Sequence, residues 1–345
     1  MLKYKIDILE ELKKKGYTSY KIRKDKLIGE AQLTKIRSGE IASKETLNTI
    51  CKLLNYQPGD ILEYIETEKM LKQQYISVTC GTIYSDLFEN KFFFSSLDHS
   101  IAVALICWHF TQDKKITLSG LFHDIATPCY SHVIDYMNED YEKQESTEEY
   151  TGYILKQDLY LKKCLEEDKI DINDIIDFKK YSVVDNDRPK VCADRIDGVI
   201  LTGIGWTKNI NMEDINRIVD DITIFKNENN EDEIGFKTLS IAQKVLQVSE
   251  SIDMYCHSNE DNYMMQLLAD ITKLAINKKY ILYSDLYFYE EEQLFSLLKE
   301  KNDEQLNDLI NKFETIKIDD IPQINLSNVK IRKLNPIVNG KRIKY

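Results

Sequence analysis

The stretch "GLFHDIATPCYSH", residues 120–132, sets an adjacent His123 and Asp124 among apolar and small side chains. A carboxylate and an imidazole in such surroundings carry a desolvation cost unless another group pairs with both. A bound metal ion would meet that need, and so would ordinary hydrogen-bond partners in a core. The residues that the rest of the chain brings to this segment decide between the two.

The composition favours a globular protein built from long helices. Of 345 residues, 43% are hydrophobic and 30% charged, with only 5 prolines and 12 glycines. No apolar run reaches membrane-spanning length, and the start "MLKYKIDILEELKKKG" does not read as a signal peptide. Seven scattered cysteines without a CxxC pair favour free thiols in a reducing cytoplasm. The sequence therefore predicts a mainly α, cytoplasmic protein with no membrane partner.

Residues 1–66 differ from the rest of the chain in charge. They hold 13 basic and 10 acidic residues, whereas the whole chain has a net charge of −12. Their apolar spacing predicts short helices in "YKIDILEELKKK", "TSYKIRKDK", "EAQLTKIR" and "SKETLNTICKLLNY". Thr18 or Ser19 would cap the second of these helices, and Ser43 the fourth.

The third helix would carry Gln32, Lys35 and Arg37 on its outer face. Gln and Arg side chains can bond base edges in a major groove, and Lys can meet phosphates. Over residues 5–65 the pattern, including "RSGE" after this helix, resembles the Cro and lambda-repressor helix-turn-helix family. The resemblance implies a DNA-binding head at residues 1–66, with a docking or dimerisation module as the alternative. Two DNA half-sites would require a homodimer or a higher homo-oligomer.

The rest of the chain is expected to form a linker at 67–80, a core at 81–225 and a helical extension at 226–345. An apolar helix should run from about Leu97 to Phe110, and "ITLSGLFHDIAT" should form another, capped by Thr117 or Ser119. Residues 225–235, "FKNENNEDEIG", are predicted to be an exposed loop. The tail "VKIRKLNPIVNGKRIKY" has six basic residues and no acidic one.

Two further positions supply metal-ligand candidates around the His-Asp pair. His99 stands at the start of the apolar helix, and Asp194 begins another helix in "VCADRIDGVI". Neighbouring side chains on a helix diverge by about 100°, so His123 and Asp124 could straddle one ion beside their helix. Two imidazoles and two carboxylates suit Mn²⁺, Fe²⁺, Co²⁺, Ni²⁺ or Zn²⁺, with Mg²⁺ as a further candidate. Such a set leaves positions open for water and a phosphate oxygen.

This order of residues resembles the HD-domain metal-dependent phosphohydrolases, and "LFHDIATPCYSH" is similar to the segment of their dNTP triphosphohydrolase branch. On that resemblance His99, His123, Asp124 and Asp194 are the ligands of one divalent metal ion. His132 is then a histidine on the substrate side. The resemblance implies a mainly α body that hydrolyses a nucleotide, with a deoxynucleoside triphosphate as the first candidate.

The chain departs from that branch at positions that bear on proton transfer. Thr127 stands where the branch has a histidine, and Gln144-Glu145 stands where it has a His-Glu pair serving as general acid. Since Gln144 cannot donate a proton to a leaving group, Glu145 is the expected acid, provided that burial raises its pKa. A third departure places Leu201-Thr202 where the branch has an Arg-Asp pair.

Cations and polar groups near these positions are expected to hold the substrate. Thr127, Gln144 and Lys190 are the substrate-binding candidates. Arg195 is expected to offset phosphate charge during catalysis, with a structural pair to Asp197 or Glu145 as the alternative.

Two other functions stay open. One is a transcriptional regulator whose body senses a nucleotide with little catalysis, and the other is a phosphodiesterase, a nucleotide pyrophosphohydrolase or a nuclease guided by the head. Glu145 distinguishes turnover from sensing, because a salt bridge away from the metal would favour the sensor. The pairing of head and body would suit a regulatory or phage-defence role.

Overall fold

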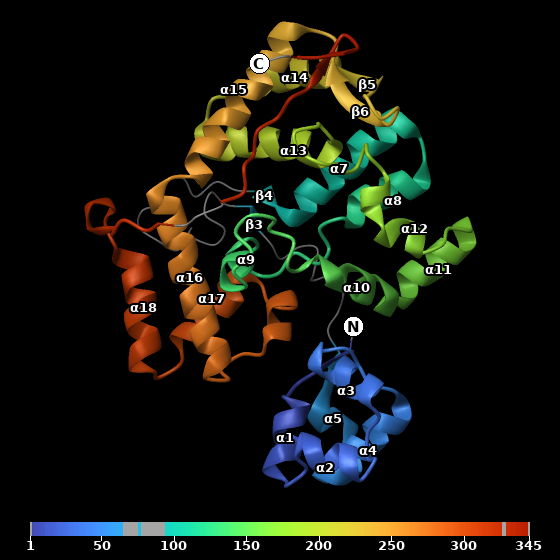
Figure 1. Ribbon diagram of the computed structural model, residues 1–345, viewed down its shortest axis with the longest axis vertical. Helices are drawn as coiled ribbons and strands as arrows, with labels where there is room; N and C mark the ends of the chain where they lie inside the picture. Colours follow the sequence, from blue (N-terminus) through green and yellow to red (C-terminus); the bar gives the residue numbers. More distant parts are fainter. Residues whose placement is uncertain (1, 65–74, 77–93, 326–328, 344–345) are drawn as a thin grey trace.

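The computed structural model describes residues 2–64, 75–76, 94–325 and 329–343. This part of the chain is mainly α-helical, as the sequence predicts, and forms a small N-terminal head below a larger body (Figure 1). Most of the expected linker 67–80 lies outside the described residues.

The head is a bundle of short helices closed by a two-stranded sheet. Its elements are β1 (Leu2–Tyr4), α1 (Ile8–Lys14), α2 (Ser19–Lys24), α3 (Glu30–Arg37), α4 (Lys44–Leu54), α5 (Pro58–Ile61) and β2 (Leu62–Tyr64), with β1 antiparallel to β2. Thr18 and Ser43 cap α2 and α4 by accepting the backbone N–H of Lys21 and Thr46. The inward-facing Leu12, Leu33 and Ile50, none of them exposed, show that these helices are held by burial of their apolar stripes.

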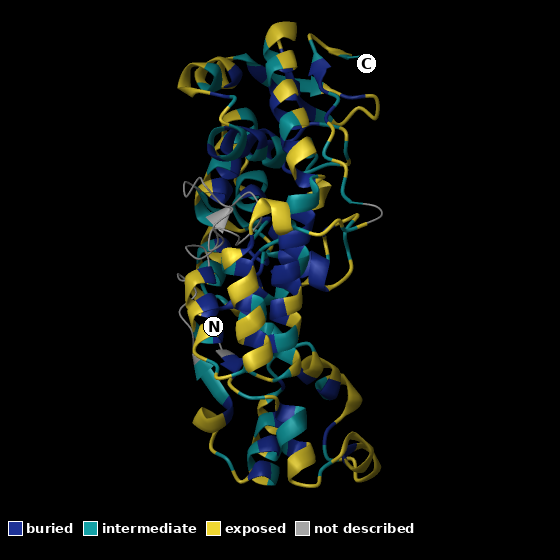
Figure 2. Ribbon diagram, turned by 90° about the vertical axis from the view of Figure 1, so that its left-hand side faces the viewer, coloured by how far each residue is buried: buried dark blue, intermediate teal, exposed yellow. Residues whose placement is uncertain are grey.

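The body packs helices into two main cores, and Figure 2 shows buried and exposed stretches alternating along these helices. Its long helices are α7 (Ser96–Thr111), α8 (Lys114–Phe122), α11 (Leu159–Asp168), α13 (Ala193–Thr202), α14 (Met212–Asp221), α15 (Leu239–Cys256), α16 (Asn259–Asn277), α17 (Glu291–Lys299) and α18 (Glu304–Thr315). Shorter helical segments are α9 (Val133–Met137), α10 (Thr151–Gln157), α12 (Asn173–Ile176), η2 (Glu148–Tyr150), η3 (Phe178–Lys180), the π-helical η4 (Gly203–Thr207), η5 (Tyr283–Tyr287) and η6 (Ile318–Asp320). The strands are β3 (Tyr75–Ile76), β4 (Phe94–Ser95), β5 (Ile222–Lys226), β6 (Asp232–Phe236), β7 (Ile337–Val338) and β8 (Lys341–Arg342).

Helix α7 matches its expected range closely, but α8 begins and ends earlier than the sequence suggests. Asp113 caps α8 by accepting the backbone N–H of Lys115 and Ile116, one turn before Thr117. The helix ends at Phe122, so His123 and Asp124 lie in the turn that follows it. The prediction that both residues belong to the helix is therefore wrong, because they directly follow its last residue.

Residues 225–235 form most of a β-hairpin and not an exposed loop, so that prediction is also wrong. Strands β5 and β6 pair from Ile222 with Phe236 to Lys226 with Asp232, and only the turn between them is irregular. Burial of one side of β6 favours the hairpin over a loop, because Ile234 and Phe236 are completely buried.

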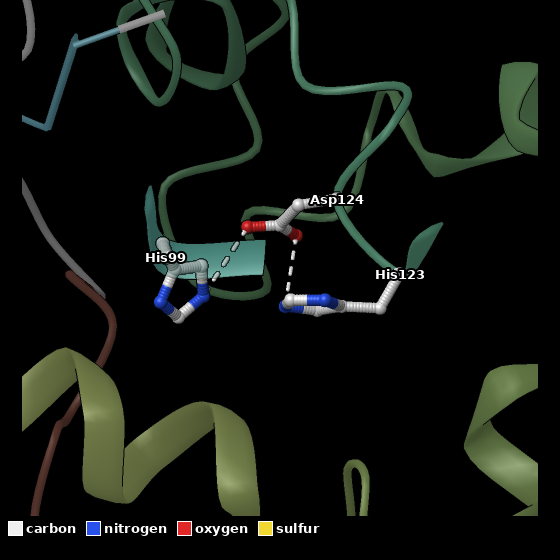
Figure 3. A group of neighbouring side chains, drawn as sticks. All are labelled: His99, His123 and Asp124. Carbon is white, nitrogen blue, oxygen red and sulfur yellow. Dashed lines mark ion pairs between the residues drawn. The ribbon is translucent and has the colours of Figure 1, made fainter. Parts of the chain in front are cut away.

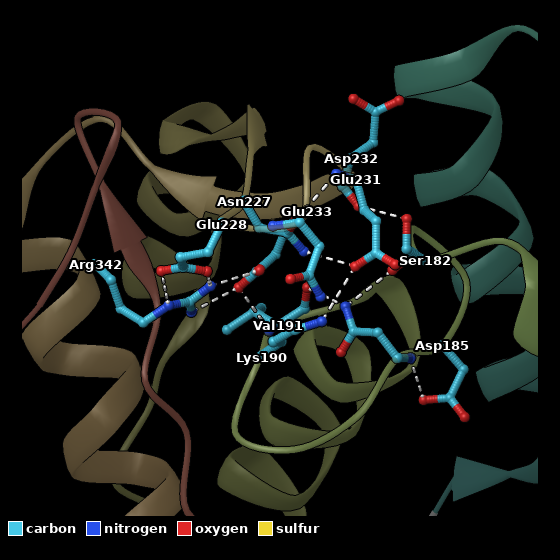
Figure 4. Close-up of polar contacts among 12 residues, drawn as sticks. Ser182, Asp185, Lys190, Val191, Asn227, Glu228, Glu231, Asp232, Glu233 and Arg342 are labelled. Carbon is cyan, nitrogen blue, oxygen red and sulfur yellow. Dashed lines mark hydrogen bonds and ion pairs between the residues drawn. The ribbon is translucent and has the colours of Figure 1, made fainter.

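The basic tail is fastened to this hairpin. Strand β7 pairs parallel to β6, and a Cβ at Gly235 would lie 2.5 Å from the carbonyl oxygen of Ile337, so only glycine fits there. Arg342 donates to Glu228 at 2.6 Å and to the fully buried Glu233 at 2.8 Å (Figure 4). These contacts fix the path of the preceding residues 329–334 along the body.

Head and body touch through a few polar contacts. The buried Lys3 ammonium lies 2.8 Å from Asp285 of the body and 3.2 Å from Glu63 of the head. The Tyr153 hydroxyl donates to the carbonyl oxygen of Gly39, just after α3, at 3.5 Å. Within the described residues, no helix combines the length and the hydropathy needed to cross a bilayer.

Candidate metal centre and nucleic-acid interface

Three predicted ligands, His99, His123 and Asp124, offer ligand atoms within 4.8 Å of one another (Figure 3), and the fourth, Asp194, lies within 3.6 Å of both imidazoles. His99 Nε2 lies 3.2 Å from Asp194 Oδ1 and 3.7 Å from Asp124 Oδ2. His123 Nε2 lies 3.5 Å from Asp124 Oδ1 and 3.6 Å from Asp194 Oδ1. Both imidazoles are buried, whereas the Asp124 and Asp194 side chains are 40% and 34% exposed and open toward the pocket.

Close packing of α7 against α8 brings His99 and His123 together. A Cβ at Gly120 of α8 would lie 3.1 Å from Cys107 Sγ and 3.3 Å from Val103 of α7, so glycine permits this approach. His99 is in the first turn of α7, and Asp194 is in the first turn of α13. The centre is therefore built where two helices begin and a third ends.

Each imidazole is oriented through its other nitrogen. His99 Nδ1 lies 2.6 Å from Asp197 Oδ2, and His123 Nδ1 lies 2.8 Å from the carbonyl oxygen of Gly120. Because a carbonyl only accepts, His123 Nδ1 carries the hydrogen and Nε2 has a free lone pair in the neutral ring. His123 Nε2 is buried and has no hydrogen-bond partner among the described residues. Metal-binding histidines are typically held in this way, by a carboxylate or a backbone carbonyl on the far nitrogen.

The electrostatics of the centre attract a cation. Burial lowers the pKa of His123, but Asp124 and Asp194 outweigh it and raise that pKa to about 9. Burial likewise acts against the protonated form of His99, yet its bonds to Asp194 and Asp197 hold its pKa well above the ordinary range. For Asp194 burial raises the pKa, and the two imidazoles bring it well below the usual range.

The donor set fits one divalent transition-metal ion. With metal–ligand bonds of about 2.0–2.2 Å, neighbouring ligand atoms lie about 3–3.5 Å apart in tetrahedral or octahedral sites. The four imidazole–carboxylate separations above span 3.2–3.7 Å, at and just above the upper end of that range. Nitrogen and carboxylate donors together are typical for Mn²⁺, Fe²⁺, Co²⁺, Ni²⁺ and Zn²⁺.

The centre opens into a cavity of about 840 Å³. Thr127, His132, Gln144 and Lys190, all predicted on the substrate side, line this cavity. His132 is oriented by Asp135, 2.9 Å from its Nδ1, and its side chain is 43% exposed.

The two residues at the position of the expected acid have other partners. Gln144 Oε1 accepts from Arg332 of the tail at 2.6 Å, so Gln144 positions a cation. Glu145 is 46% exposed and pairs with Lys179 at 3.0 Å, which does not match the buried acid expected from the sequence. Glu148, one turn later, pairs with Lys179 at 2.8 Å and also lines the cavity. Burial raises the pKa of Glu148 despite that lysine, and the charges of Glu145 and Asp124 add to the rise.

Arg195 lines the cavity, and its guanidinium also makes several contacts within the body. Its guanidinium donates to Asp185 at 2.9 Å, to the carbonyl oxygen of Lys190 at 3.0 Å and to Asn186. Neither Asp197 nor Glu145 is its partner. Lys190 itself pairs with Glu231 of the hairpin at 3.1 Å (Figure 4).

Sequence reasoning missed several residues of the site. Asp197 could have been found, because it is three residues after Asp194 and so shares its helix face. Lys330 and Arg332 alternate in an extended segment, which places both on one side of the chain, yet no local signal ties them to this cavity. The buried Asp261 has no sequence signal at all.

The predicted DNA-reading residues are distributed over α3 of the head. Lys35 is 49% exposed and lies 3.7 Å from Glu40, and Arg37 is 40% exposed and pairs with Glu30 at 3.1 Å. Gln32 Oε1 accepts the backbone N–H of Ser43 at 2.7 Å, so its carbonyl supports the start of α4. Glu30 also pairs with Arg23, and these two arginines lower its pKa to about 2.

The head matches a known family model. Residues 7–67 match the model of the Cro/C1-type helix-turn-helix DNA-binding domain. This match covers the head and none of the body.

Two comparisons reach across most of the chain. The chain is 24% identical over 260 residues to the uncharacterized protein YdhJ of Bacillus subtilis, which covers 74% of this chain and 77% of that protein. A crystal structure of a hypothetical protein from Aquifex aeolicus superposes with a TM-score of 0.52 at 14% identity, covering 72% of this chain and 68% of that one. The second likeness shows a shared fold only.

Proposed function

We propose that the body is a metal-dependent phosphohydrolase that acts on a nucleotide, joined to the DNA-binding helix-turn-helix head. The observation that carries the proposal is the convergence of His99, His123, Asp124 and Asp194, with the buried His123 Nε2 lacking any hydrogen-bond partner among the described residues. A deoxynucleoside triphosphate remains the first substrate to test.

The four ligands would hold one divalent metal ion. When bound, such an ion lowers the pKa of a water molecule and polarises a phosphoryl oxygen. Asp197 and the Gly120 carbonyl keep both imidazoles aimed at the ion. Glu148 is the carboxyl that we propose as the proton donor to the leaving group, because its pKa is raised and it faces the cavity.

The test is product analysis by chromatography after incubation with dNTPs, NTPs and cyclic nucleotides, with Mn²⁺ or with chelator. We expect Mn²⁺-dependent product that disappears in Asp124→Ala and persists in Asp319→Ala, which removes an exposed carboxylate on η6. Metal analysis of the same two proteins should show about one ion per chain in the control and loss in Asp124→Ala. Retained metal and activity in Asp124→Ala would refute the proposed centre.

A nucleotide sensor is the second candidate. It is favoured by the salt bridge of Glu145 with Lys179, and by Gln144, which positions Arg332 where the enzymes that the sequence resembles have a His-Glu pair. Tight nucleotide binding without product, in a protein that holds its metal, would support the sensor. Activity that falls in Glu148→Gln but not in Glu145→Gln would support the enzyme.

A further inference from the structure

One part of the cavity wall, which we call the Asp261 end, holds none of the metal ligands, and the proposed reaction does not use its chemistry. Helices α15 and α16 form this end with Ile252, Cys256, Asp261 and Met265. Cys256 and Met265 are buried beside the single carboxyl of Asp261. An apolar wall with one polar group is the usual composition of a small-molecule site.

The Asp261 carboxyl has no structural partner among the described residues. The residue is 7% exposed, and its Oδ1 is fully buried without a hydrogen bond. Ser258 caps α16 by accepting the backbone N–H of Asp261, but no return bond from the Asp261 side chain completes a capping box. Burial raises the pKa of Asp261 to about 8, and Arg332 is the charge that opposes this rise. A buried carboxyl that does no structural work and faces a cavity is a candidate for ligand recognition.

Between Asp261 and the metal ligands the cavity wall is positively charged. Arg188, Lys330 and Arg332 all line it. Of these three side chains, only that of Arg332 has hydrogen-bond partners among the described residues, namely Gln144 and the carbonyl oxygen of Lys330. Burial and the other two cations lower the pKa of Lys330, while Asp194 and Glu145 act against that. Burial also lowers the pKa of Arg188 to about 10, together with Arg195 and Arg332. Like charges held together in a partly desolvated wall favour a bound anion.

The tail is held firmly enough to form this wall. The backbone N–H of Arg332 donates to Asp253 at 2.7 Å, and its carbonyl oxygen accepts from Ser249 at 3.1 Å. Both partners lie on α15, and the adjoining Leu334 is buried in the same core. Arg332 thus stands between the Asp261 end and the Gln144 side of the cavity.

We propose that the cavity binds a nucleoside polyphosphate whose base carries an exocyclic amino group, with that amino group donating to Asp261 and the phosphate chain lying across Arg188, Lys330 and Arg332. This inference rests on the proposed function, since it names the substrate class of the same site. A carboxyl keeps an acceptor oxygen in both of its protonation states, so an amino donor suits it throughout the neutral pH range. The phosphates are assigned to the cations because a carboxyl would repel them.

The experiment measures nucleotide binding without turnover, by calorimetry on the full chain in the presence of a chelator. It compares nucleotides two at a time, with bases that differ at one exocyclic position. CTP against UTP, ATP against ITP and GTP against ITP each compare an amino-bearing position with an oxo or unsubstituted one. We expect at least one amino-bearing nucleotide to bind about 10- to 100-fold more tightly than its partner, because a buried polar group left without a partner costs about 1–3 kcal/mol. The affinity for inorganic triphosphate should fall in Lys330→Ala and stay at the wild-type value in Asp261→Leu.

In Asp261→Leu the favoured nucleotide should bind only as well as its partner. Asp261→Asn, which keeps an acceptor oxygen, should retain part of the preference and serves if the leucine variant does not fold. No preference in the wild-type protein, or a preference that survives in Asp261→Leu, would overturn the base assignment. Unchanged triphosphate binding in Lys330→Ala would overturn the phosphate assignment. A preference with no Mn²⁺-dependent product would refute the phosphohydrolase and leave this binding site standing.

Discussion

Replacing Glu291 with glutamine should stabilise the body at alkaline pH. Glu291 begins α17 and is 0% exposed, within the core formed by α9, α16, α17 and α18. Burial raises the pKa of its carboxyl to about 8, and the backbone N–H of Tyr130 acts against that rise only in part. The carboxyl therefore binds its proton more tightly in the folded chain than in the unfolded one.

The sign of the effect follows from this difference. Stability from a raised carboxyl pKa is fully present below the unfolded value of 4.5 and is lost as the pH rises through about 8. At about 1.4 kcal/mol per pKa unit, the loss between these limits is about 5 kcal/mol. Since a glutamine side chain does not ionise, the stability of Glu291→Gln relative to wild type should increase by roughly 3–5 kcal/mol between pH 5 and pH 8.5.

Thermal and urea unfolding at pH 5, 7 and 8.5 would measure this change. We expect the midpoint of Glu291→Gln to exceed that of wild type at pH 8.5 by on the order of 10 °C, and the two to converge at pH 5. Glu292→Gln is the matched control, because it removes the same charge from the next, exposed residue of α17. A stability difference that does not vary with pH would refute the buried, raised carboxyl.

Three further predictions test the centre, the tail and the head. Asp197→Asn should weaken Mn²⁺ binding about 10- to 100-fold, measured by competition with a chelator, because His99 loses its orienting carboxylate; unchanged affinity would contradict that role. Gly235→Ala should destabilise the body by about 1–3 kcal/mol and expose the tail to protease, since its Cβ would meet the Ile337 carbonyl oxygen at 2.5 Å; wild-type protease resistance would show that the strands can shift. Lys35→Ala should weaken DNA binding alike on all sequences and reduce the salt slope by about 1, measured by anisotropy titrations; a sequence-dependent loss would instead assign Lys35 to base edges.

Local pattern predicted the helices of the head well, because each apolar stripe closes one small core and each cap is adjacent in sequence. It failed where the decisive partner is remote. One edge of β6 pairs with β7, which lies near the end of the chain, so the sequence of residues 225–235 alone looked like a polar loop. Asp113, and not the predicted Thr117, caps α8, because its carboxylate accepts hydrogen bonds from two backbone N–H groups.

The same limit applies to the site. The metal ligands could be proposed because three helix ends carry them at positions that resemble a known pattern. Gln144 and Arg332 are 188 residues apart, and the sequence around neither residue predicts their hydrogen bond. The role of Gln144 changes with that bond, from a defective proton donor to a positioning residue for a cation.

The cavity lining carries acidic residues at the candidate metal centre and basic residues on the tail. A ligand that binds both would connect the two parts of the chain. Asp124 and Asp194 form a negative side that a divalent cation would neutralise, and Lys330 and Arg332 form a positive side that a phosphate chain would neutralise. A metal-bound phosphate ester satisfies both sides at once, whereas a metal ion alone leaves the cations opposed to one another. The double variant Lys330→Ala, Arg332→Ala should therefore weaken binding of inorganic triphosphate while Mn²⁺ binding to the four proposed ligands is retained, and calorimetry with each ligand separately would measure the two affinities; loss of both would contradict this division of charge.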